Sequence, residues 1–133
     1  MHCDLRPRSR YAAQKLGHVI LALMREPGTL QDRFDRVVAS GDLVAVFTED
    51  FPPELRGDWH RLIGALYPTD RKLRAIRTEV FSGEYISKRT PAEKMDPRRL
   101  EEWVHALLVL NQEFQAYDPE GSRAVREIKG LLV

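Results

Sequence analysis

The sequence DPRRLEEWVHALLVLNQEFQ, residues 96–115, decides the fold class. Asp96 is a good N-cap, because its carboxylate can accept hydrogen bonds from backbone N–H groups of a first helical turn. Pro97 suits the first helical position, where a missing N–H costs nothing. We therefore predict a helix from Pro97 to about Gln115. Its apolar side chains recur at helical spacing and should face the core: Leu100, Trp103, Leu107, Leu110 and Phe114.

The same helix carries more apolar surface than one core-facing stripe requires. Leu108 and Val109 extend apolar character around the cylinder, and Asn111, the only asparagine of the chain, lies near the edge of the stripe. A face this broad indicates more than one packing neighbour. Asn111 either fixes helix register, as buried amides do at dimer seams, or bonds a neighbouring loop. We take Leu108, Val109 and Asn111 as candidate protein-interaction residues.

Turn and cap residues divide the rest of the chain into helix-sized pieces. Apolar periodicity predicts helices over 9–26, 30–41, 53–66, 69–81 and a last one after Ser122. Met24 and Phe81 follow the periodicity and are expected to face inward, and Gly17 permits close helix–helix approach. Residues 43–47 form either a short strand or a helical turn. No second strand is available for pairing, so a helical turn or an extended loop is favoured.

Two further local patterns complete the expected fold. The residues Thr90-Pro91-Ala92-Glu93 form a capping-box sequence, which predicts one short helical turn. Residues 1–8 are expected to be a disordered tail. The prediction is an all-α, compact, single-domain helical bundle of about five helices with short turns, spanning residues 1–133.

Composition places the chain among ordinary globular proteins, with 43% hydrophobic and 31% charged residues among 133. A single cysteine, Cys3, fits a reducing compartment. The longest apolar run, Val19 to Met24, is far shorter than the ~20 residues of a spanning helix, so no membrane contact is expected. Basic residues precede that run without a cleavage pattern after it. We therefore expect a cytoplasmic protein.

Charge is distributed in blocks although the net charge is only +1. Residues 71–99 hold nine basic and four acidic residues, whereas acidic residues predominate over 30–58. The basic segment 71–89 could neutralise phosphates of a nucleic acid, or its charges could pair within the fold. The residues of this alternative nucleic-acid-binding or regulatory function are Arg71, Arg74, Arg77, Lys88 and Arg89.

Arg99 and His105 are separated by five residues, and this spacing resembles the active-site motif of the HEPN helical ribonucleases. The resemblance implies RNA cleavage, with His105 as acid–base and Arg99 holding phosphate. It covers these two residues only, and Leu100 stands where a polar residue usually follows the arginine. A HEPN-like ribonuclease is therefore a remote third alternative.

The sequence shows no phosphate-binding glycine loop, no serine nucleophile elbow and no histidine–cysteine spacing typical of metal sites. We therefore expect no cofactor and no metal, and a non-catalytic function is favoured over an enzymatic one. The leading hypothesis is a cytoplasmic protein–protein interaction module that self-associates as a homodimer. It rests on the surplus apolar surface of helix 97–115 and on the alternating charge blocks.

Overall fold

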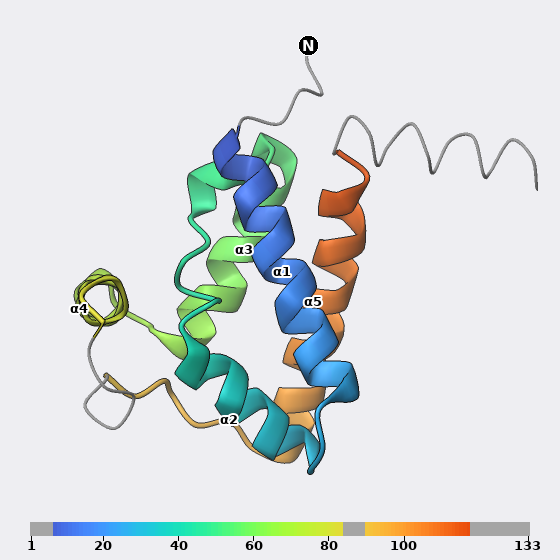
Figure 1. Ribbon diagram of the computed structural model, residues 1–133, viewed down its shortest axis with the longest axis vertical. Coiled ribbons are helices and arrows are strands. Elements are labelled where there is room, and N and C mark those ends of the chain that lie inside the picture. Colours follow the sequence, from blue (N-terminus) through green and yellow to red (C-terminus); the bar gives the residue numbers. More distant parts are fainter. Residues whose placement is uncertain (1–6, 84–89, 118–133) are drawn as a thin grey trace, which may run out of the picture.

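The computed structural model describes residues 7–83 and 90–117, and it is all-helical over these ranges (Figure 1). The compact arrangement confirms the predicted all-α fold class, with no strand in the described residues. The elements are α1 Pro7–Arg25, α2 Leu30–Ser40, the 3-10 turn η1 Thr48–Asp50, α3 Pro53–Leu66, α4 Asp70–Phe81 and α5 Pro97–Gln115.

Three helices, α1, α3 and α5, lie side by side and enclose the core, with α2 packed across one end of α1 (Figure 1). The five apolar residues of the predicted stripe on α5 are all buried. Trp103 Nε1 donates a hydrogen bond to the Leu62 carbonyl oxygen at 2.9 Å. The rings of Phe51 and Phe114 lie 4.4 Å apart. These two contacts show that α3 and α5 run antiparallel.

The predicted caps form as local sequence indicates. The Asp96 carboxylate accepts a hydrogen bond from the Arg99 N–H at 2.9 Å and begins α5. Thr29 and Asp32 form a reciprocal capping box at the start of α2. Gly41 ends α2 with φ at 80°, a left-handed conformation that glycine adopts without steric cost.

Residues 43–47 do not form a strand. Residues Leu43, Val44, Ala45 and Val46 are buried. The Ala45 N–H donates to the Gly41 carbonyl oxygen at 3.2 Å, which is a helical-type bond. The stretch is therefore a buried turn, and the favoured interpretation is confirmed.

Three expectations are corrected by the structure. Met24 is 64% exposed and Phe81 is 59% exposed, so neither side chain faces the core. The short helical turn expected at Thr90 is absent, because residues 90–96 carry no helix. The Thr90 hydroxyl instead donates to the Glu79 carboxylate at 2.6 Å and connects this segment to α4.

The structure describes only part of the two chain ends for which the sequence makes predictions. The first helix, α1, begins at Pro7, so residues 7 and 8 of the expected tail are helical, and residues 1–6 lie outside the described residues. The helix expected after Ser122 also lies outside them. No helix in the described part of the chain is long and apolar enough to cross a membrane.

Candidate functional site

The three predicted interaction residues lie on two different sides of α5. Leu108 and Asn111 are half-buried and lie on the side that faces α1, whereas Val109 is 40% exposed and lines a groove between α5 and α3. Two adjacent surfaces of the molecule therefore have to be distinguished. We call them the α1/α5 face and the α3/α5 groove.

The α1/α5 face is held together by amide hydrogen bonds. The Gln115 side-chain N–H₂ donates to the Ala13 carbonyl oxygen of α1 at 3.3 Å and to Asn111 Oδ1 at 3.2 Å. Asn111 thus supports a contact inside the chain rather than a bond to a loop. Since α1 and α5 run in opposite directions (Figure 1), the bond from Gln115 to Ala13 places the end of α5 beside the first half of α1.

Apolar side chains continue along this face beyond the amide contact. On α1, Ile20 is half-buried, Leu21 is 48% exposed and Met24 is 64% exposed. Their positions follow Gly17 at three, four and seven residues, which is the spacing of one helix face. On α5, Val104 and Leu108 are half-buried at the matching levels. Apolar side chains of the two helices thus occur at matching levels.

Gly17 lies near the middle of the α1/α5 face. A Cβ atom built at this position would meet no atom within 4 Å. The absent side chain is therefore not required for packing against the described residues of this chain.

The α3/α5 groove is a separate cavity of about 350 Å³. Its apolar floor consists of Leu62 on α3 and of Ala106, Val109 and Leu110 on α5. Its charged lining comprises Asp58, Arg61 and Glu113. Arg61 donates a hydrogen bond to the Asp58 carboxylate.

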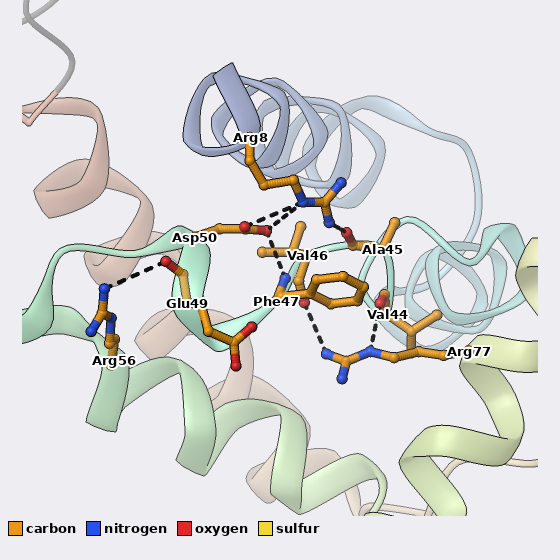
Figure 2. A network of polar contacts seen from close by, with 9 residues as sticks. All are labelled: Arg8, Val44, Ala45, Val46, Phe47, Glu49, Asp50, Arg56 and Arg77. Atoms are coloured by element: carbon orange, nitrogen blue, oxygen red, sulfur yellow. Dashed lines mark hydrogen bonds and ion pairs between the residues drawn. The ribbon is translucent and has the colours of Figure 1, made fainter. Parts of the chain in front are cut away.

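The predicted basic segment is only partly available for binding. Arg71 and Arg74 are exposed on α4, but Arg77 is half-buried. The Arg77 guanidinium donates to the Val44 carbonyl oxygen at 3.0 Å and to the Val46 carbonyl oxygen at 3.2 Å (Figure 2). Lys88 and Arg89 lie outside the described residues. The described part of the segment therefore provides two exposed arginines, together with Lys72, which pairs with Glu93.

Arg77 belongs to a network around the buried turn that sequence reasoning missed (Figure 2). The Phe47 ring lies between two guanidinium groups, with Arg8 Cζ 4.5 Å and Arg77 Cζ 4.4 Å from its centroid. Arg8 also donates to the Ala45 carbonyl and, at 3.2 Å, to the buried carboxylate of Asp50. Burial lowers the pKa of Arg77, while the nearby acidic groups oppose that shift.

This network is structural in character. The Asp50 carboxylate accepts a further hydrogen bond from the Phe47 N–H at 2.9 Å. Arg56 donates to the Phe51 carbonyl oxygen at 2.9 Å and to the Glu49 carbonyl oxygen at 3.5 Å. The charged groups thus satisfy backbone atoms of a turn that lacks regular hydrogen bonding.

A second cavity of about 300 Å³ lies between α2, α4 and residues 90–95. Apolar side chains including Phe34, Val38, Ile76 and Met95 line it, together with the acidic residues Asp35 and Glu93. Glu93 also forms an ion pair with Lys72 on α4 at 3.0 Å.

Arg99 and His105, the two residues of the HEPN-like alternative, both lie on α5. Both are exposed on α5, and a separation of six residues places them about 120° apart around the helix axis. Neither residue lines either of the two cavities. The described residues also contain no group of histidine, cysteine and acidic side chains that could hold a metal ion.

Comparison of the chain with models of protein families, with curated proteins and with solved structures gives no match.

Proposed function

We propose that this protein is a cytoplasmic, non-catalytic interaction module that self-associates through the α1/α5 face. The observation that carries the proposal is the exposed apolar stripe on α1, with Leu21 48% exposed and Met24 64% exposed. Large apolar side chains that cluster on one surface are typical of protein–protein contacts. The cytoplasmic assignment is supported by the single cysteine of the chain.

The dimensions of the α1/α5 face suit a weak dimer. Both helices have 19 residues. At 1.5 Å per residue each helix is about 28 Å long, so two helices that are each about 9 Å wide present at most about 500 Å² per copy, and a dimer would bury at most about 1,000 Å². This area lies at the lower limit for specific interfaces, which supports an association that depends on micromolar concentrations.

A second copy is the occupant that this face fits best. A twofold dimer brings the same patch of both copies together, and pairing α1 of one copy with α5 of the other would form a four-helix arrangement. Arg25 and Glu101 are both exposed, at neighbouring ends of α1 and α5. Such pairing would bring Arg25 of one copy near Glu101 of the other.

The test compares charge substitutions inside and outside the face by sedimentation velocity. Leu21→Glu and Met24→Glu each place a carboxylate in the proposed interface, and the twofold symmetry doubles its effect. We expect each variant to weaken dimerisation at least tenfold. Phe81→Glu on α4 is the matched control, because Phe81 is equally exposed but lies away from the face. Equal dimerisation of all three variants would refute the proposed interface.

Nucleic-acid binding is not proposed as a second function. Arg77, the central residue of the predicted basic set, donates to two backbone carbonyl groups. Arg74 donates to the Asp70 carbonyl oxygen at 3.4 Å within its own helix. No specific observation favours phosphate recognition by these side chains.

A further inference from the structure

The helix α4 is the one least connected to the rest of the described fold. Figure 1 shows it beside the bundle, apart from α1, α3 and α5. Ile76 is its one buried residue, and Leu73 and Val80 are half-buried, whereas α3 and α5 each bury five residues. Among the described residues, no backbone hydrogen bond joins α4 to another element. The apolar contact that holds α4 in place is therefore much smaller than the contact that holds the core together.

Polar side chains supply the other attachments of α4 to the described residues. Each of these groups can bond to water when α4 moves away, so the net contribution of each contact to the closed form is modest. The contacts join Arg77 to the Val44 and Val46 carbonyl oxygens, Lys72 to Glu93, and Glu79 to Thr90.

The residues that flank α4 are exposed on both sides. Pro68 and Thr69 precede the helix, and Ser82 and Gly83 follow it. A Cβ atom built at Gly83 would meet no atom within 4 Å, so this end of α4 has free space around it. Backbone rotations at these residues can therefore move α4 while α1, α3 and α5 keep their contacts with one another.

We infer that α4 opens as a separate unit while α1, α3 and α5 stay folded, and that this opening uncovers the second cavity. Ile76 lines that cavity together with Phe34 and Val38 of α2. Separation of α4 removes the Ile76 side of the cavity and exposes the apolar side chains of α2 to solvent. The helix thus acts as a conformational switch between a closed and an open form. The inference is independent of self-association, because α4 is not part of the α1/α5 face.

A detached α4 also loses its own helical structure. It has 12 residues, and an isolated helix of this length is marginally stable in water. Its amide hydrogens therefore exchange with solvent whenever α4 opens. The amide hydrogens at the centre of α5 exchange only when the core itself unfolds, which requires more free energy.

Hydrogen exchange of the full chain, followed for each amide by NMR spectroscopy, tests the inference. After correction for intrinsic rates, the slowest amides of α4 should exchange about 100-fold faster than the slowest amides of α5. Urea at concentrations below the unfolding transition should accelerate exchange in α5 more steeply than in α4, because opening of α4 alone exposes less surface. Equal exchange rates in the two helices, or an equal dependence on urea, would overturn the inference.

Two substitutions distinguish separate opening from global unfolding. Val19 is buried on α1, which packs against α2, α5 and η1. Val19→Ala should accelerate exchange in α5 about tenfold and change exchange in α4 by less than about twofold. Ile76→Val destabilises only the closed form, so it should accelerate exchange in both helices by the same factor, roughly three- to tenfold.

The two variants also define results that contradict a separate opening. One is an acceleration of α4 exchange by Val19→Ala that is as large as that of α5. The other is the absence of any acceleration of α4 exchange by Ile76→Val, which would show that the α4 amides exchange without leaving the Ile76 contact. The urea series on the unmodified chain decides between the two mechanisms even where a substitution prevents folding.

Discussion

Arg77 is a charged side chain that this fold uses as a backbone hydrogen-bond donor. Its guanidinium bonds the Val44 and Val46 carbonyl groups and packs on the Phe47 ring. Val44 and Val46 are buried, so water is a poor substitute for this donor. The residue therefore holds the turn 43–47 against α4.

Replacing Arg77 by alanine should lower the free energy of unfolding by about 2 kcal/mol, because two carbonyl groups lose a charged donor. Urea denaturation followed by circular dichroism measures this change. Arg74→Ala is the control, since Arg74 is exposed on the same helix and its loss should cost less than about 0.5 kcal/mol. Equal effects of the two substitutions would show that the Arg77 contacts do not stabilise the turn.

The two tryptophans provide a second comparison at the scale of single residues. The Trp103 indole donates to the Leu62 carbonyl oxygen, whereas Trp59 Nε1 is buried with no hydrogen-bond partner among the described residues. Trp103→Phe removes the bond to the Leu62 carbonyl oxygen, whereas Trp59→Phe removes no bond, so Trp103→Phe should cost about 1 kcal/mol more than Trp59→Phe. Thermal or urea unfolding of both variants decides this. A larger loss for Trp59→Phe would contradict the described bonding.

Single residues differ in how far sequence predicts their roles. Asp96, Thr29 and Gly41 act on backbone groups within a few positions, so their sequence context predicts them as caps. The role of Arg77 depends on carbonyl groups more than 30 residues away in the chain. No local sequence pattern predicts these distant bonds. The position of Arg77 within a basic block instead predicts an exposed side chain.

Among the helices, α5 has the clearest beginning, and its cap can be tested separately from its packing. Asp96→Ala should reduce stability by about 1 kcal/mol, because the Arg99 N–H loses its acceptor. Asp96→Ser keeps an acceptor at the N-cap and should retain most of the stability. Chemical denaturation of the two variants gives the comparison. Equal losses would show that the Asp96 side chain does not act as the cap.

The fourth helix, α4, is attached mainly by side chains. Ile76 is its one buried residue in the described structure, and Arg77 supplies its bonds to the turn 43–47. Lys72 and Glu79 connect it to residues 90–93 through Glu93 and Thr90. This arrangement explains why Phe81 was wrongly predicted to face the core. A helix that contacts the core along a narrow line buries fewer of its apolar side chains than their spacing suggests.

The capping-box sequence at Thr90 illustrates the same limit for a whole element. The sequence allows a helical turn, but Glu79 binds both the hydroxyl and the backbone N–H of Thr90. The N–H of Glu93, which a capping box would use, instead donates to the Leu66 carbonyl oxygen at 2.8 Å. Tertiary hydrogen bonds therefore replace the local ones.

At the scale of the whole molecule, α1, α3 and α5 form a core with two incompletely covered surfaces. The sequence predicts more apolar surface on α5 than the core requires, and it indicates Leu108, Val109 and Asn111 as candidate interaction residues. It could not show that Val109 belongs to the groove with α3 while the other two face α1. That division depends on the positions of neighbouring helices. It also explains why Leu21 and Met24 were missed, since their exposure depends on how α1 packs.

Sedimentation equilibrium of the unmodified chain over 1–100 µM, a range of the order expected for a small interface, tests self-association most directly. We expect an average mass that rises with concentration from the monomer value of 15.4 kDa toward twice this value. The Met24→Glu variant should stay near the monomer mass over the same range. A mass of 15.4 kDa for the unmodified chain at every concentration would contradict the account.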